Sequence, residues 1–559
     1  MRRASMASRS AAAGLLLLGV AAAASAQSGA ATLAQADRDW RLLHTASAMR
    51  GYERVTADPR VAADGWLGLG RIHAFRGWQA EGAFPGWHEE VDQRPLALAA
   101  YRRAADLRPD WAAPHVALGE ALLLDGRPAE AAAAFARALA LAPGDPAATR
   151  GAQRASGATP ADPEREALAA IDAAMKAGPP EAAVAAVRAF ERRWPSSPRL
   201  IEAGDRLLAI YLAWDAAPSA DVLAAVEARL DLRPDPMAYA AAINVLLARR
   251  VALDRVGALA EAGTAAGERF VTENEPSYKL GGKVRAFRDR TRAGFADQTG
   301  WAAFLQGDRS AADRHLEEAA RLANGTDVVN QFHRAELARA RGDAELARER
   351  YYEALSLDSP PPLARLRAAA EAALAGLYAA EGVTAADTEV NIGRELERRR
   401  DERRRALLSS ALGKALPALP TTDMAGTPVA LPAAKGQVIL LNFFAAWCGA
   451  CRQEIPFIQQ AYERYKDDPA VRFVLVSLDD DPRRLERYVA ERQFQMPVLR
   501  MTRDQAAAAL DVQDTPWTFY VDAGGTIRYE VRGLEPHGDA VARISWYIDR
   551  LKADAAGAR

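Results

Sequence analysis

The sequence predicts a multidomain protein in which an α-helical solenoid is followed by an α/β domain. Three observations support this fold class. At 559 residues the chain is too long for a single hydrophobic core. The first 400 positions are rich in Ala and Leu with few β-branched residues, which favours helix. Residues 415–553 instead alternate strand-like and helical segments, as in an α/β domain with a central sheet.

The amino terminus has the pattern of a secretory signal peptide over residues 1–26. Three arginines precede an apolar run at residues 11–24, and a small-x-small site ends at Ala26. The run is too short for a comfortable membrane span, so cleavage after Ala26 and export to a bacterial periplasm are expected. An uncleaved membrane anchor is the alternative. No cysteine follows the run, which excludes a lipoprotein.

Internal repeats are expected from residue 40 to residue 385. The segment HVALGEALLLDGRPAEAAAAFARALALAP places small residues where paired helices would cross, one large residue between them, and a proline at the end. In this pattern the segment resembles a tetratricopeptide repeat. The matching positions are Leu118, Gly119, Ala131, Phe135, Ala138 and Pro143.

Further units of this repeat are expected around Tyr101, Leu316 and Tyr351, with a degenerate middle. The resemblance implies a concave groove that binds a protein or peptide partner. A spacer or dimerising scaffold without a specific ligand is the alternative. Trp78, Phe84 and Trp87 mark an insertion whose aromatic side chains form either a binding lip or simple packing.

Residues 386–414 predict a charged helical connector. The run RELERRRDERRR mixes acidic with basic residues, as on a solvated helix. A basic docking patch is the less favoured interpretation. Pro417 and Pro420 end the segment and mark the start of the last domain.

The last domain, residues 415–553, is expected to open with a short strand, a turn and another strand at residues 416–427. Strands and helices then alternate around a central sheet. Strands are expected at Val438–Phe444, Val471–Leu478, Thr518–Val521 and Ile527–Arg532, and helices at Arg452–Asp467, Pro482–Gln493 and Asp539–Lys552.

Charge and cysteine content exclude several classes of function. A net charge of −1 gives no indication of nucleic acid or anionic membrane as a partner. The chain has two cysteines, Cys448 and Cys451, too few for a disulfide framework. Zinc would need two more ligands, and Arg452 stands where a c-type haem site needs His. We therefore expect no metal or cofactor, and interpret the Cys-x-x-C pair as a redox site.

Three segments carry a family resemblance. They are NFFAAWCGACRQEIP around the cysteines, the preceding extension ALPALPTTDMAGTPVAL, and Thr515-Pro516 before a strand. By these motifs, residues 415–553 resemble the thioredoxin superfamily, specifically the exported TlpA/ResA-like thiol–disulfide oxidoreductases. A peroxiredoxin shares the fold but needs Thr three residues before its reactive cysteine, where this chain has Ala445.

The position of the two cysteines predicts their roles. Cys448 would lie at a helix N-terminus, where free N–H groups and the helix dipole favour the thiolate, the form that attacks a substrate disulfide. Cys451, one turn deeper, would then release the substrate and close the Cys448–Cys451 disulfide. Glu454 lies three residues further on the same helical face. A buried carboxylate there would have a raised pKa and could accept the proton of Cys451.

The resemblance adds further expectations. Thioredoxins carry an acid at the position of Asn442, whereas ResA-like proteins have Glu at that of Glu454. An ordinary solvated charge is the alternative for Glu454. Pro456 should kink its helix. The substrate-binding residues are expected to be Trp447, Thr515 and Pro516, with Pro516 as the family's cis-proline.

The predicted function is that of an exported thiol–disulfide oxidoreductase, with the helical repeats recruiting partners. The Gly449-Ala450 dipeptide does not fix the redox direction. Resemblance favours a reductase of apocytochromes or other periplasmic proteins, supplied with electrons by a membrane thiol donor of the DsbD/CcdA type. The alternatives are a repeat-based scaffold whose thioredoxin domain senses redox state or binds peptides, and a disulfide oxidase or isomerase.

Overall fold

The computed structural model divides into two compact units, the first ending at Asp308 and the second beginning at Arg309. The helices expected between residues 40 and 385 are thus shared between both units. The expected signal peptide, Phe84 and Trp87 lie outside the described residues. The described ranges are 29–79, 91–158, 162–274, 281–357, 363–409, 412–430, 436–479, 482–533 and 540–557.

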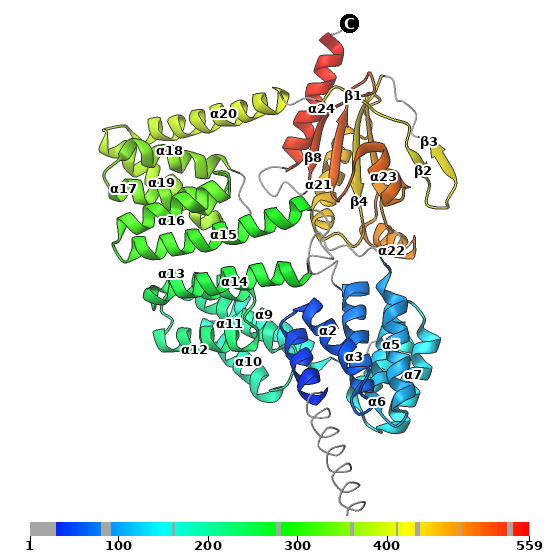
Figure 1. Ribbon diagram of the computed structural model, residues 1–559. Coiled ribbons are helices and arrows are strands. Elements are labelled where there is room, and N and C mark those ends of the chain that lie inside the picture. Colours follow the sequence, from blue (N-terminus) through cyan, green and yellow to red (C-terminus); the bar gives the residue numbers. More distant parts are fainter. Residues whose placement is uncertain are drawn as a thin grey trace, which may run out of the picture. The chain divides into compact units, whose positions relative to one another are not determined.

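The first unit is helical, and helices adjacent in the sequence pack against one another (Figure 1). Several begin with Pro in the first turn, and Asp145 and Asp162 cap two of them by accepting backbone N–H groups. Residues 29–41 are also helical. The remaining bounds are α2 (Thr45–Val55), α3 (Ala62–Ala74), a π-helix η1 (Phe75–Gln79), α5 (Gln93–Leu107), α6 (Ala112–Leu124), α7 (Pro128–Leu141), α8 (Pro146–Ala155), α9 (Pro163–Ala177), α10 (Pro180–Arg193), α11 (Leu200–Ala213), α12 (Ser219–Leu232), α13 (Pro236–Arg249), a 3₁₀ turn η2 (Leu253–Arg255), α14 (Val256–Asn274) and α15 (Gly281–Leu305).

The packing around Phe135 has the small–large pattern that the repeat spacing predicts. Its ring is fully buried between Gly119 on α6 and Gly151 on α8. A Cβ added at Gly119 or Gly151 would lie 2.7 or 2.2 Å from the ring. Only a residue without a side chain therefore lets the helices approach this closely.

In the first unit, helix α2 near its start contacts helix α14 near its end. The Thr45 hydroxyl on α2 donates to Oδ1 of Asn274 at 2.6 Å, and the Ser47 hydroxyl and N–H both donate to the Glu273 carboxylate at 2.8 Å. These residues are more than 220 positions apart in the sequence. An open solenoid has contacts only between neighbouring repeats. The first unit departs from that pattern because polar side chains on α2 and α14 pair with each other.

The second unit begins with five helices. The predicted connector is mostly the last of them. Its middle has one exposed face, with Glu397 and Arg398, and one buried face, with Leu396 and Arg399. Arg399 is buried on α20, where its guanidinium pairs with Glu349, Glu353 and Glu395. A buried charge needs such partners, so α20 packs as part of the helical layer. The bounds are α16 (Arg309–Leu322), α17 (Val328–Ala340), α18 (Ala344–Ser356), α19 (Ala364–Ala380) and α20 (Ala385–Ser409).

An eight-stranded mixed sheet follows, with the order β1-β8-β7-β4-β5-β6-β2-β3. The central strand β4 pairs in parallel with β5 and antiparallel with β7. The strands are β1 (Lys414–Ala415), β2 (Pro420–Thr422), β3 (Pro428–Ala430), β4 (Val438–Phe444), β5 (Val471–Ser477), β6 (Val498–Arg500), β7 (Trp517–Val521) and β8 (Thr526–Arg532), and the helices are α21 (Gly449–Tyr465), α22 (Pro482–Arg492), α23 (Arg503–Leu510) and α24 (Ala540–Gly557).

Helices cover both faces of this sheet. Alternate residues of β4 enter two different cores, with Leu440 and Phe444 on one face and Leu441 and Phe443 on the other. The first core includes α21, α22 and α24, and the second includes α23. All the strands and helices expected after residue 437 are present to within a few residues. Strand β6 and helix α23, both of which are short, were not expected from the sequence.

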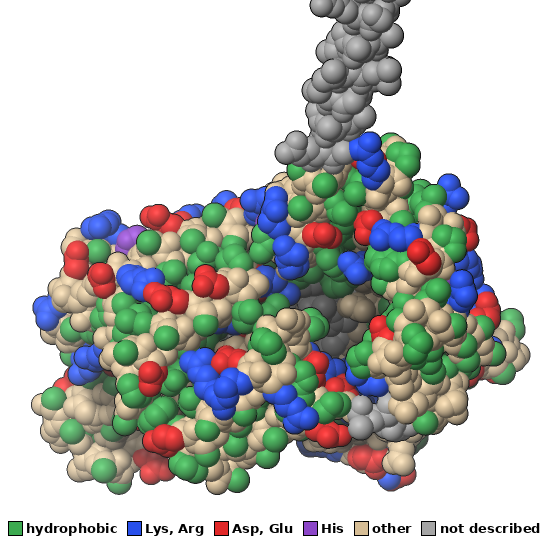
Figure 2. Space-filling view, turned by 90° about the horizontal axis from the view of Figure 1, so that it is seen from below, with side chains coloured by type: hydrophobic (Ala, Val, Ile, Leu, Met, Phe, Trp, Pro, Cys, Tyr) green, Lys and Arg blue, Asp and Glu red, His purple; other side chains and the backbone are tan. Residues whose placement is uncertain are grey.

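The surface carries mixed charges. On the face shown in Figure 2, acidic and basic side chains are interspersed, and neither sign dominates. This agrees with the net charge of −1. Among the described residues, none of the helices is both long enough and apolar enough to cross a bilayer.

Candidate redox site

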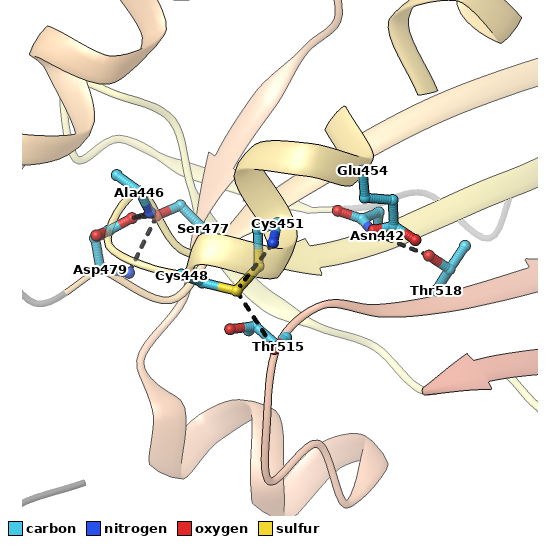
Figure 3. Close-up of a disulfide and its surroundings, with 9 residues drawn as sticks. All are labelled: Asn442, Ala446, Cys448, Cys451, Glu454, Ser477, Asp479, Thr515 and Thr518. Carbon is cyan, nitrogen blue, oxygen red and sulfur yellow. Dashed lines mark hydrogen bonds between the residues drawn. A yellow bond between two sulfur atoms is a disulfide. The ribbon is translucent and has the colours of Figure 1, made fainter. Parts of the chain in front are cut away.

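The two cysteines lie where the central strand enters its helix (Figure 3). Strand β4 ends at Phe444, residues 445–447 turn, and Cys448 is the N-cap of α21. A disulfide joins Cys448 to Cys451. Cys448 is 6% exposed and Cys451 is 0% exposed. Of the two sulfurs, only that of Cys448 is therefore near enough to the surface to meet another protein.

The helix N-terminus provides a favourable environment for negative charge on Cys448. The N–H of Cys451 lies 3.1 Å from the Cys448 Sγ and points toward it. Unpaired N–H groups and the helix dipole stabilise an anionic sulfur at this position. Once the disulfide is reduced, the same N–H is available to the Cys448 thiolate.

A second chain segment covers the sulfur of Cys448. The carbonyl oxygen of Thr515 lies 3.4 Å from the Cys448 Sγ. The Thr515–Pro516 peptide bond is cis, as the resemblance implies, and Pro516 is buried just before β7. The structure thus brings together Cys448, Thr515 and Pro516, residues nearly 70 positions apart in the sequence.

Glu454 is partly buried and contacts the sheet. Its Oε2 accepts a hydrogen bond from the Asn442 side-chain amide at 3.0 Å, and that amide also donates to the Thr518 hydroxyl at 2.9 Å (Figure 3). Asn442 is fully buried on β4. Because a buried amide holds the carboxylate, the simple alternative of a solvated helix charge does not describe Glu454. Asn442 thus contacts Glu454 from the position where thioredoxins carry an acid.

Sequence reasoning missed a second carboxylate, Asp479, which follows the end of β5. Its Oδ2 accepts the N–H of Ala446 and the hydroxyl of Ser477, both at 2.8 Å. Burial raises the pKa of Asp479, against the hydrogen bonds from Ala446 and Ser477 and the positive charges of Arg484 and Arg503. In the sequence, Asp479 directly follows the expected strand Val471–Leu478. Its approach to the cysteine turn depends on the parallel pairing of β4 with β5, which places Phe444 opposite Ser477.

Trp447 lies partly exposed beside the cysteine pair. The Arg503 guanidinium, from the first turn of α23, stacks 4.6 Å from the centre of its ring. A cation over an indole face is favourable. Arg503 therefore limits the orientations of the one aromatic side chain in the turn before Cys448.

The second unit also contains a groove of about 760 Å³ among α18, α19 and α20. Its wall is charged and aromatic, and many of the charges pair with one another. Arg348 pairs with Glu381 and lies over the Tyr378 ring, and the hydroxyls of Tyr352 and Tyr378 are 2.9 Å apart. The groove lies on α18 and α19, within the region where repeats are expected, and on α20, which follows that region.

Comparison with known proteins relates the last domain to redox proteins. Residues 412–530 match the family model described as the AhpC/TSA family. The thiol–disulfide oxidoreductase ResA of Bacillus thuringiensis subsp. konkukian is 26% identical over 122 residues, which cover 22% of this chain and 70% of that protein. ResA of Geobacillus kaustophilus is 27% identical over 142 residues, covering 25% of this chain and 79% of the relative.

The solved structures that resemble this chain match about a quarter of it. The thioredoxin domain of a thiol–disulfide oxidoreductase from Bacteroides vulgatus is 24% identical, with a TM-score of 0.21, and the match covers 25% of this chain and 98% of that one. A thiol:disulfide interchange protein of the thioredoxin family from Chlorobium tepidum is 22% identical, with a TM-score of 0.21, over 24% of this chain and 95% of that structure.

Proposed function

We propose that this chain is an exported reductase of protein disulfides that acts through Cys448 and Cys451. Its carboxy-terminal domain is similar to thiol–disulfide oxidoreductases of the ResA type. The observation that carries the proposal is the position of Cys448. It is the N-cap of α21, receives the Cys451 N–H, and lies against the carbonyl of Thr515. The signal-peptide pattern of residues 1–26 supports export.

The reaction proceeds in two exchanges. The Cys448 thiolate attacks one sulfur of the substrate disulfide, which forms a mixed disulfide and releases the other substrate sulfur as a thiolate. Cys451, once deprotonated, attacks the Cys448 sulfur, which releases the second substrate sulfur and closes the Cys448–Cys451 disulfide. The substrate gains two electrons and two protons. A membrane thiol donor of the DsbD/CcdA type would return two electrons to the cysteine pair.

Each remaining site residue has a role in this scheme. Glu454 accepts the proton of Cys451 and is held in place by the Asn442 amide. Trp447 forms the exposed surface beside Cys448, Pro516 fixes the chain beneath it, and the backbone of Thr515 aligns the substrate chain. Peroxide reduction is not part of the proposal, although the AhpC/TSA model matches. Ala445 stands where a peroxiredoxin has Thr, and it is fully buried.

The reduction potential of the cysteine pair tests the direction of transfer. We expect a value near that of thioredoxin, about −270 mV, and far from the roughly −120 mV of the oxidant DsbA. Equilibration of the full-length protein with glutathione or dithiothreitol buffers, followed by alkylation and mass measurement, gives this value. A potential close to that of DsbA would replace the reductase with the oxidase or isomerase alternative.

The helical region, residues 40–385, is proposed to recruit client proteins. Linked binding modules raise the effective concentration of a partner without changing the chemistry. A truncated protein of residues 412–559, which keeps the pairing of β1 with β8, should therefore reduce a small disulfide as fast as the full chain. On a protein client it should be slower by about 10²-fold.

The clients for this comparison can be those that the Cys451→Ser variant traps from a periplasmic extract. The small disulfide is the internal control, since loss of activity on both substrates would mean a misfolded truncation or the scaffold alternative. If the truncated protein matches the full chain on every trapped client, the helical region is a spacer and recruits nothing.

A further inference from the structure

Asp479 is a buried carboxylate behind the turn that carries the cysteines, and the proposed reaction does not use it. It lies on the opposite side of the disulfide from Glu454 (Figure 3). The residue is buried, with 6% of its surface exposed. The free-energy cost of burying an isolated carboxylate is high, which indicates that Asp479 has a role at this position.

The contacts of Asp479 identify what it holds. Its Oδ2 accepts two hydrogen bonds at 2.8 Å, from the N–H of Ala446 and from the hydroxyl of Ser477. The Ser477 oxygen in turn accepts the Asp479 N–H at 3.1 Å, which fixes the carboxylate to the end of β5. The Oδ1 atom is buried and has no hydrogen-bond partner among the described residues. Ala446 is two residues before Cys448.

The same turn has a second support. Arg503 stacks over Trp447, the residue between Ala446 and Cys448, and its charge also acts on Asp479. Two elements outside the turn, the end of β5 and the start of α23, therefore fix its backbone and its aromatic side chain. A displacement of this turn would move the Cys448 sulfur relative to the Thr515 carbonyl, 3.4 Å away.

We propose that Asp479 is a positioning residue for Cys448, which fixes the turn of residues 445–447 by accepting the Ala446 N–H. The inference rests on the proposed reaction at Cys448 and deepens it. To hold the Ala446 N–H, the side chain needs an oxygen acceptor at the position of Oδ2. It does not need a negative charge. Displacement of a reacting group by about 1 Å can lower the reaction rate by about 10²-fold even when every reacting group is present.

Three substitutions in the full-length protein separate position from charge. Asp479→Asn keeps an oxygen acceptor and removes the charge, so it should retain turnover of a small disulfide to within about threefold. Asp479→Ala removes the acceptor and should lose about 10- to 10²-fold. Asp479→Glu keeps the charge but displaces the oxygens by one methylene, and should be impaired like Asp479→Ala. Ser477→Ala is the matched control for the neighbouring hydroxyl and should cost less than Asp479→Ala.

Near-ultraviolet circular dichroism establishes that each variant is folded. If Asp479→Ala does not fold, the comparison of Asp479→Asn with Asp479→Glu decides alone. If Asp479→Glu is active and Asp479→Asn is impaired, the negative charge is what matters. If all variants are equally active, Asp479 has no role in positioning the turn. Either result overturns the proposal. Wild-type protein that reduces no disulfide would instead refute the proposed function.

Discussion

Cys448→Ser is expected to abolish disulfide reduction, whereas Cys451→Ser is expected to attack substrate once and then stop as a mixed disulfide. The two variants should differ because Cys448 is more exposed than Cys451 and precedes it on the helix. The Cys448 sulfur is near the surface at the N-cap of α21, and Cys451 is fully buried one turn deeper. A serine hydroxyl cannot replace a thiolate in either exchange. Only the loss of Cys451 leaves the first exchange intact.

The adduct can be measured by non-reducing gel electrophoresis and intact mass. Because the chain has only two cysteines, each single variant has one thiol, and any disulfide adduct is assigned without peptide mapping. The double variant is the control for nonspecific association. Equal loss in both variants with no adduct on Cys451→Ser, or an adduct on Cys451 in Cys448→Ser, would contradict the assigned order.

The central strand and the cysteine turn could be predicted from the sequence because their signals are local. An apolar run that ends in Cys-x-x-C fixes strand β4 and the start of α21, and the observed strand has the expected bounds, Val438–Phe444. Strand β6 and helix α23 were missed because three and eight residues are too short to show a period.

Residues that act through distant contacts were harder to predict. Asp479 follows a strand end like many surface aspartates, and only the parallel pairing of β4 with β5 brings it to Ala446. Arg399 lies within a charged run that is typical of a solvated helix, yet three carboxylates surround its guanidinium. In both cases tertiary contacts determine the environment, and composition alone favours the solvated interpretation.

The two carboxylates beside the cysteines have different environments. Glu454 is partly exposed, receives one amide hydrogen bond, and lies one turn along α21 from Cys451. Asp479 is buried and bonded to the turn before Cys448. A group that exchanges protons needs a route to solvent, whereas one that fixes a backbone does not. We therefore propose that Glu454 accepts the proton and that Asp479 positions the turn.

Glu454→Gln is expected to slow turnover by about 10²-fold, at the lower end of the range for loss of a general base. The substitution keeps the size of the side chain and an oxygen for the Asn442 amide, and removes the carboxylate that would accept the proton. The first exchange, at Cys448, should be unaffected. The second should become slow, since the Cys451 thiol is left without its proton acceptor, and the mixed disulfide should accumulate during turnover.

Rapid acid quenching and alkylation measure both exchanges separately. Glu463→Gln is the matched control, because Glu463 is an exposed residue of the same helix that pairs with Lys466. An equal effect of both substitutions would indicate a general change in helix charge. If Glu454→Gln matches wild type throughout about pH 6 to 9, the range in which a general base would act, then Glu454 is not the proton acceptor and Cys451 loses its proton to water.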